Sequence, residues 1–417
     1  MSAPIASEPG RETLAIRRTF AAEAVRAIAS GVIETALATF AVLIAVNRFE
    51  SGPLTKSLLL ACPALGLLGS LVIVPLAVRA GLTASRAAAG ISLVSLGGFL
   101  IAALGAQRET VFVLGMIIGI GVLTMAIPLQ THYLRANYPV SRRGRLFSVT
   151  IFLRALTTMV MSWVFGVYLD ADFSRYPTLL WCMAGASAVV VVCYLCVPST
   201  TLRDAAEKRN RLLESVHVSR DDRVFVRVLM AMMILGLGVL SANALRVDFL
   251  ANPEHGLALD VKTVSIITGI IPSVVRLGST FFWGLLFDRM NFFILRGLIN
   301  LVFLVGILLH FVWADVTLIM IGAALFGLAR GGGEIMFNLW VTKVAPFDRI
   351  ADYMSVHTFL AGIRLLLAPF LGFFLVTWVS VSLMVAVSAS LALASIGFVI
   401  WAARAAREDV DFGRRLG

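Results

Sequence analysis

The stretch SVTIFL at Ser148–Leu153 returns as SVHTFL at Ser355–Leu360, at an offset of 207 residues in a chain of 417. The same ungapped offset pairs further residues: Gly115 with Gly322, Pro139 with Pro346, and Tyr133 with Trp340. The offset is close to half the chain length. In an apolar chain, a half-length repeat predicts two homologous helical bundles, as in membrane proteins that expose a central site to each side in turn.

The composition is that of a membrane protein: 59% of the residues are hydrophobic, 14% are charged, and the mean hydropathy is +0.93. Soluble domains are typically about half apolar. The apolar runs are about 20 residues long, the length that a helix needs to cross a hydrocarbon core of roughly 30 Å. The chain lacks the ten-residue alternating pattern of a membrane β-barrel. We therefore predict an all-α membrane protein with twelve transmembrane helices in two pseudo-symmetric six-helix bundles.

The twelve predicted spans divide into two groups of six. The first six are Ala21–Asn47, Ser57–Val78, Ala87–Gly105, Val111–Tyr133, Leu146–Leu169 and Pro177–Val197. The second six are Phe225–Leu245, Val261–Phe287, Phe292–Trp313, Val316–Val341, Ala351–Val376 and Val379–Ala402. We expect an N-terminal bundle at 1–200, a polar cytoplasmic linker at 201–223 and a C-terminal bundle at 224–417.

The net charge of +11 is distributed very unevenly along the chain. With the N-terminus inside, 22 Lys and Arg residues fall in cytoplasmic segments and 5 in external ones. This asymmetry is the positive-inside bias, which sets the orientation of a membrane protein. We therefore expect both termini to be cytoplasmic and the partner surface to be a lipid bilayer, with no role in binding nucleic acid. We place the protein in a bacterial inner membrane.

Several chemistries are disfavoured by what the sequence lacks. No Gly is followed directly by Lys, so the phosphate-binding loop of nucleotide hydrolases is absent. The four cysteines, Cys62, Cys182, Cys193 and Cys196, lie in predicted spans, and no second pair completes a zinc site. No soluble segment is long enough to form a catalytic domain. We expect no enzymatic activity, no metal and no cofactor, and we expect a gradient or a partner protein to supply the energy.

The loop between the eighth and ninth spans carries a recognisable motif, GLLFDR at Gly284–Arg289. It resembles the G-x-x-x-D-R-x-G-R-R loop of the major facilitator superfamily, although Met290, Asn291 and Phe292 depart from the pattern. The copy between the second and third spans, PLAVRAG, keeps Arg79 but has Val78 where the motif has Asp. The twelve-span layout with a central linker resembles the same superfamily.

The resemblance implies a gate at this loop. Asp288 and Arg289 lie at the predicted cytoplasmic edge, where a charge contact can hold one conformation and break in another. We expect Gly284 to allow a close approach between helices. Arg79 is the corresponding residue of the first half. The alternative is an ordinary turn with interfacial charges.

Six ionisable residues lie deep in the predicted spans: Glu34, Arg154, Arg276, Arg330, Glu334 and Arg364. Charges at this depth are costly, and they usually face a bundle interior or a wet cavity. In the superfamily layout, spans 1, 2, 4, 5, 7, 8, 10 and 11 line the central cavity. All six residues fall on these spans, which makes them candidates for the substrate site.

Helical spacing adds further candidates. Arg330, Glu334 and Asn338 share one face, and the first two can pair as a structural salt bridge. Gly331–Gly333 lies between them and permits either close packing or local unwinding. His357 shares a face with Arg364. A further polar cluster ends the fourth span, where Gln130 is a candidate for the cavity or for a backbone contact.

Four arginines oppose two glutamates among the six deep residues. Guanidinium groups bind carboxylate or phosphate through two parallel hydrogen bonds. The excess therefore favours an organic anion as the substrate, bound by Arg154, Arg276, Arg330, Arg364, Asn338 and Gln130. The candidates for proton coupling are Glu34, Glu334 and His357, because a desolvated carboxylate takes up a proton more readily.

We therefore predict a monomeric, proton-coupled secondary transporter that works by alternating access on a small molecule. Two alternatives stay open. One is an exporter of hydrophobic drugs or lipids. The other is a scaffold or assembly factor that kept the fold without transporting. The sequence does not choose between import and export.

Overall fold

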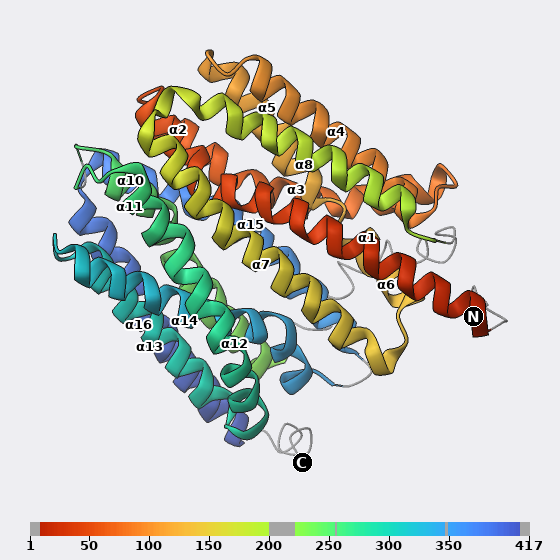
Figure 1. The fold of residues 1–417 in the computed structure, drawn as a ribbon. Helices are drawn as coiled ribbons and strands as arrows, with labels where there is room; N and C mark the ends of the chain where they lie inside the picture. The colour runs from red at the N-terminus through yellow and green to blue at the C-terminus, as the bar shows by residue number, and fades with distance from the viewer. Residues whose placement is uncertain (1–8, 200–221, 255–256, 347–348, 409–417) are drawn as a thin grey trace. The chain divides into compact units, whose positions relative to one another are not determined.

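The computed structural model describes residues 9–199, 222–254, 257–346 and 349–408 (Figure 1). They form two compact units. The first comprises Met1–Ser51 with Leu58–Arg209, and the second comprises Gly52–Ser57 with Asn210–Gly417. The predicted linker at 201–223 lies almost wholly outside the described residues.

The first unit is built almost entirely from helices. In chain order they are α1 (Pro9–Thr35), the π-helical η1 (Ala36–Phe40), α2 (Ala41–Asn47), α3 (Pro53–Arg79), α4 (Ala84–Leu104), α5 (Glu109–Thr124), α6 (Ile127–Asn137), α7 (Val140–Ala171), the short 3₁₀ turn η2 (Phe173–Arg175) and α8 (Tyr176–Cys196). The first turn of α3 groups with the second unit.

The second unit is also helical. It contains α10 (Arg223–Ala251), α11 (Val261–Ser265), the π-helical η4 (Ile266–Ile270), α12 (Ile271–Arg289), α13 (Phe292–Phe311), α14 (Val316–Val344), α15 (Ile350–Trp378) and α16 (Val381–Glu408). Acidic and amide side chains set several helix starts. Asp222, Asn291 and Asp315 each accept a hydrogen bond from a backbone N–H in the first turn of α10, α13 and α14, respectively.

The helices match the twelve predicted spans. Eleven of the described spans are long and apolar enough to cross a membrane unbroken. The twelfth is α3, in which the parts Pro53–Gly69 and Val72–Arg79 meet at an angle of 48°. Pro75 lacks the N–H that would bond to the carbonyl of residue 71, so the helix is weakened at this bend. With α3 as one bent span, the twelve-helix prediction is confirmed.

The internal repeat is visible in the packing of the two units. In the first unit α1 packs on α7 and α8, and α4 packs on α5 and α8. In the second unit α10 packs on α15 and α16, and α13 packs on α14 and α16. These pairs correspond under the 207-residue offset. The prediction of two pseudo-symmetric bundles is therefore confirmed.

Repeated residues hold corresponding places in the two cores. A Cβ atom added to Gly115 would lie 2.6 Å from the carbonyl oxygen of Gly98, and one added to Gly322 would lie 2.8 Å from the backbone nitrogen of His310. Both glycines thus permit a close approach between adjacent helices. Tyr133 and its counterpart Trp340 are both fully buried. Conservation of these positions within the chain reflects packing.

Candidate functional site

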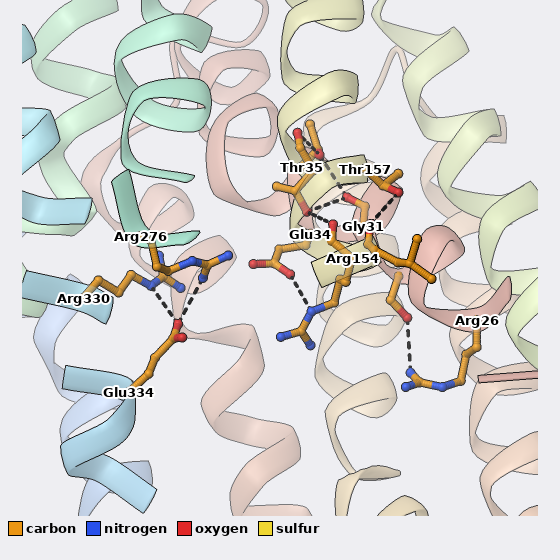
Figure 2. A network of polar contacts seen from close by, with 12 residues as sticks. Arg26, Gly31, Glu34, Thr35, Arg154, Thr157, Arg276, Arg330 and Glu334 are labelled. Atoms are coloured by element: carbon orange, nitrogen blue, oxygen red, sulfur yellow. Dashed lines mark hydrogen bonds and ion pairs between the residues drawn. The ribbon is translucent and has the colours of Figure 1, made fainter. Parts of the chain in front are cut away.

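In the first unit, a mid-helix ion pair joins α1 to α7. Arg154 Nε lies 3.3 Å from Glu34 Oε2, and the two side chains are 44% and 28% exposed (Figure 2). The helices are fixed at this level because Thr35 Oγ1 donates to the carbonyl of Thr158 at 3.0 Å. A Cβ atom on Gly31 would come within 2.7 Å of the Arg154 carbonyl. The predicted deep charges Glu34 and Arg154 thus neutralise each other within one unit.

A second carboxylate of α1 is completely enclosed. Glu23 is 1% exposed and accepts two hydrogen bonds from Arg26, both at 2.9 Å. It also accepts one from Gln130 Nε2 at 2.8 Å and one from the Tyr133 hydroxyl at 2.5 Å. The Arg26 guanidinium lies 5.6 Å from the centre of the Tyr194 ring. The predicted substrate residue Gln130 therefore belongs to a buried network that ties α1 to α6.

In the second unit, one carboxylate serves two arginines. Glu334 Oε1 lies 3.0 Å from Arg276 Nη1 and 3.7 Å from Arg330 Nε (Figure 2). The contact between Arg330 and Glu334 follows from their i,i+4 spacing on α14. The contact with Arg276 comes from α12, which packs on α14. The Glu334 carboxylate thus contacts one arginine on α12 and one on its own helix, α14.

The glycines of α14 favour close packing over unwinding. The helix runs unbroken through Gly331–Gly333. A Cβ atom on Gly332 would lie 2.9 Å from Trp283 and from Ile299, and one on Gly331 would lie 2.9 Å from Ser279 Oγ. Small residues at these positions allow α12 and α13 to approach α14.

The second unit also contains a partly open cavity of about 280 Å³, lined by residues of α10, α13, α14 and α15. Its walls combine apolar side chains with Arg296, Arg330, Glu334, His357 and Arg364. Arg364 Nη1 donates to the carbonyl of Met232 at 2.6 Å. His357 is fully buried, with its ring 4.6 Å from that of Phe337. The cavity unites four predicted site residues: Arg330, Glu334, His357 and Arg364.

Arg296 was missed as a site residue by the sequence analysis. It is 5% exposed and lies on α13, a helix that the cavity assignment of the superfamily leaves outside the site. It is the fifth residue of the predicted span Phe292–Trp313, and the sequence analysis selected only ionisable residues that lie deeper in the membrane. Its unusual burial for an arginine is a tertiary effect, which the sequence pattern did not signal.

Three further buried charges were placed in predicted loops. Lys56 Nζ lies 2.5 Å from Asp248 Oδ1, and the two side chains are 8% and 2% exposed. Arg246, 6% exposed, donates from Nη2 to the carbonyl of Ile267 at 2.9 Å. The helix α3 begins four residues before the apolar window Ser57–Val78, and α10 ends six residues after Phe225–Leu245, which explains the omission.

The predicted gating residues lie at exposed helix ends. Arg79 ends α3, and Asp288 and Arg289 end α12. The expected role of Gly284 in a close helix approach is wrong. Among the described atoms, the nearest neighbour of a Cβ atom there would be Ile335 Cδ1, at an ordinary 3.9 Å. The side chain of the candidate Asn338 lies outside the described part of the chain.

Two further expectations concern metals and shared geometry. Within the described ranges, no group of three or more His, Cys, Asp or Glu side chains is arranged to hold a metal ion.

Arg154 belongs to the first unit and Arg364 to the second. The prediction that both face one central volume stays a prediction.

Solved structures of transporters share this fold. The nucleoside transporter NupG has a TM-score of 0.71 at 13% identity, covering 94% of this chain and 98% of that one. The peptide transporter POT in complex with sulfate has a TM-score of 0.70 at 13% identity, covering 96% and 95%. The D-xylose–proton symporter has a TM-score of 0.59 at 15% identity, covering 93% and 96%. At these identities the likeness establishes the fold alone. No curated protein sequence matches the chain.

Two pseudo-symmetric helical bundles with charged side chains inside apolar spans define a multi-pass integral membrane transporter. The family model of the Major Facilitator Superfamily matches residues 24–369, which is most of the chain. The chain belongs to this superfamily, as the loop motif at Gly284–Arg289 and the layout of the spans predicted.

Proposed function

We propose that this protein is a secondary active transporter of a small organic anion, driven by protons through alternating access. The observation that carries the proposal is the cavity of the second unit, which has three arginines and one carboxylate in its walls. Arginine cannot give up its charge in a protein, so the cavity stays positive across the physiological pH range. An anion is the solute that such a cavity favours.

The coupling role falls to the shared carboxylate. Glu334 is 45% exposed and holds both Arg276 and Arg330. Uptake of a proton by Glu334 would free both guanidinium groups for a substrate anion. Glu34, which holds Arg154 in the first unit, offers the same chemistry. The fully buried His357 is the third candidate, and its place in the cavity wall supports it.

The names of the structural neighbours fit a proton-coupled transporter without selecting a substrate. They include transporters of nucleosides and peptides and a D-xylose–proton symporter. These solutes differ widely in charge. The anion class therefore rests on the residues of this chain.

Transport into proteoliposomes tests the proposal. We would offer lactate, succinate and glycerol 3-phosphate, with xylose and tetraphenylphosphonium as uncharged and hydrophobic comparisons. An imposed proton gradient should drive accumulation of at least one anion, and a protonophore should abolish it. Movement of tetraphenylphosphonium alone would favour the hydrophobic exporter. If the protein neither transports nor binds any of these solutes, the scaffold alternative replaces the proposal.

Glu334→Gln separates coupling from binding. The amide cannot exchange a proton, so anion exchange across the membrane should persist while accumulation against the gradient is lost. Glu34→Gln is the matched variant in the first unit. If both variants accumulate the anion like the parent protein, neither carboxylate carries the coupling proton.

For the gate, we propose that Asp288 and Arg289 bias alternation together with Arg79. All three are exposed, so Asp288→Asn should leave the melting temperature nearly unchanged, since surface substitutions usually change stability by no more than about 0.5 kcal/mol. The variant should alter the labelling rate of a single cysteine placed at Val239 in the cavity wall, in a cysteine-free background. Equal labelling rates with normal transport would make Asp288 a plain surface charge.

We also propose a bacterial inner membrane, with both termini and the 201–223 linker in the cytoplasm. The basis is the ratio of 22 to 5 basic residues between the two sides. Single cysteines at Ser2 and Ser215 should resist impermeant reagents in intact cells and react after lysis. Labelling of either site from outside would reverse the orientation.

A further inference from the structure

Two arginines of the second-unit cavity have no carboxylate partner. Within the described residues, neither Arg296 nor Arg364 forms an ion pair, and the buried Nε atom of each lacks a hydrogen-bond partner. The Arg364 guanidinium donates from Nη1 to the Met232 carbonyl. Both side chains line the same cavity. Two like charges thus lie in the wall of one cavity.

The acidic group of the cavity does not compensate these charges. Glu334 is already engaged by Arg276 and Arg330. Its single negative charge is therefore opposed by two positive charges before Arg296 and Arg364 are counted. Buried charges are usually paired, because an unpaired one is strongly penalised by desolvation. Within the part of the chain that the structure describes, the positive charge of the cavity is therefore not balanced.

We propose that Arg296 and Arg364 form the binding site for a substrate that carries two negative charges. The inference rests on the proposed function, because it specifies the class of anion that the same cavity takes. Each guanidinium presents a planar fork to a carboxylate or phosphoryl oxygen pair. A dicarboxylate and a phosphate monoester both carry this charge, the first on two groups and the second on one.

The size of the cavity limits the substrate to a small molecule. Ligand pockets usually measure about 300–1,000 Å³, and this one, at about 280 Å³, lies at the lower end. Arg296 comes from α13, whereas Arg364 comes from α15. A dianion held by both would bridge two helices that line the cavity, and Arg296 would then determine specificity for the second charge.

Arg246 offers a matched control. It is as deeply buried as Arg296 and also carries a buried Nε without a partner. However, its guanidinium donates to the Ile267 carbonyl and lies 4.9 Å from the centre of the Phe326 ring. It is also absent from the cavity wall. Its contacts are structural, so its removal should not change which anion is preferred.

Isothermal titration of the purified full-length protein with succinate, glycerol 3-phosphate and lactate tests the inference. At least one dianion should bind about 10- to 100-fold more tightly than lactate, because each charge-assisted contact is worth roughly one to two decades. Arg296→Gln should remove most of this preference, so that the dianions and lactate bind within about threefold of each other. Arg296→Lys should retain part of it, since the charge remains and the fork is lost.

The two dianions distinguish whether the arginines bind two separate anionic groups or one doubly charged group. Preference for succinate would indicate two separate carboxylate contacts, and preference for glycerol 3-phosphate would indicate one phosphoryl group between the arginines. Arg246→Gln should lower the melting temperature and leave the preference intact. If the parent protein binds lactate as tightly as both dianions, or Arg296→Gln and Arg296→Lys both keep the preference, the inference is overturned while anion transport stands. If no anion binds or is transported, the proposed function fails with it.

Discussion

The two units neutralise their buried charges differently. In the first unit each acid has its own arginine, Glu23 with Arg26 and Glu34 with Arg154. In the second unit Glu334 is shared by two arginines, and Arg296 and Arg364 have no acid in the described residues. The two acids of α1 are thus paired within the first unit. The unpaired arginines of the second unit are the basis for placing the proposed anion site there.

The internal repeat sharpens this contrast. At the 207-residue offset, Glu34 corresponds to Ser241, Glu23 to Met230, and Arg364 to Thr157. The repeat thus preserves packing positions, such as Tyr133 and Trp340, and replaces the charges. Corresponding helices pack alike in both units. The two units therefore differ in their charged side chains, although their helices pack in the same pairs.

The largest effect is expected at a balanced pair of the second unit, Lys56 and Asp248. Lys56→Ala leaves Asp248 buried without a counter-charge, which should cost about 3–5 kcal/mol. The double variant Lys56→Met with Asp248→Leu should recover most of the loss. Melting in detergent at one fixed scan rate measures both, since unfolding of such proteins is often irreversible. A single variant as stable as the parent would show that this pair adds nothing.

A smaller loss is expected in the first unit for Glu23→Gln. The change removes the charge that compensates Arg26 in an enclosed network, and should cost about 2–3 kcal/mol. Glu34→Gln is the control. Its pair is partly exposed, so its loss should not exceed about 1 kcal/mol. Equal shifts in melting temperature for the two variants would contradict the difference in burial on which the prediction depends.

The comparison between units is tested most directly by Arg364→Ala and Arg154→Ala. Arg364 lacks an acid partner, so its loss should weaken anion binding about 10- to 150-fold. Arg154 is engaged by Glu34, so its loss should weaken binding by less than about threefold. Titration with the anion that the parent transports gives both values. Equal losses would return Arg154 to the substrate site, as the sequence analysis predicted.

The smallest effect is expected from a single methyl group. A Cβ atom on Gly236 would lie 2.5 Å from Nη1 and 2.6 Å from Nε of Arg364. Gly236→Ala should therefore displace this guanidinium and weaken anion binding roughly threefold to tenfold. Gly397→Ala is the control, because a Cβ atom there meets nothing within 4 Å. If both variants bind the anion like the parent, the position of Arg364 is not critical.

The sequence predicted the fold well because the length of the apolar runs and the internal repeat can both be read directly from the order of residues. It also predicted the contact of Arg330 with Glu334, which depends only on helical spacing. It did not predict that Arg276 would join them, because this contact depends on how α12 crosses α14. Lys56 and Asp248 were assigned to loops, since a hydropathy window ends at the first charges even where the helix continues. Arg296 was overlooked because the position of a residue along a predicted span does not show whether neighbouring helices cover its side chain.

The π-helical turn η4 has a consequence of its own. There the N–H of Ile271 donates to the carbonyl of Ile266, five residues back. The same pattern would pair the carbonyl of Ile267 with residue 272, but Pro272 has no N–H to donate. Arg246 supplies the missing donor from α10. The widened turn is thus stabilised by a side chain distant in sequence. Deletion of one residue from Ile266–Ile270 would change the pairing of this carbonyl, so Arg246 and the widened turn depend on each other.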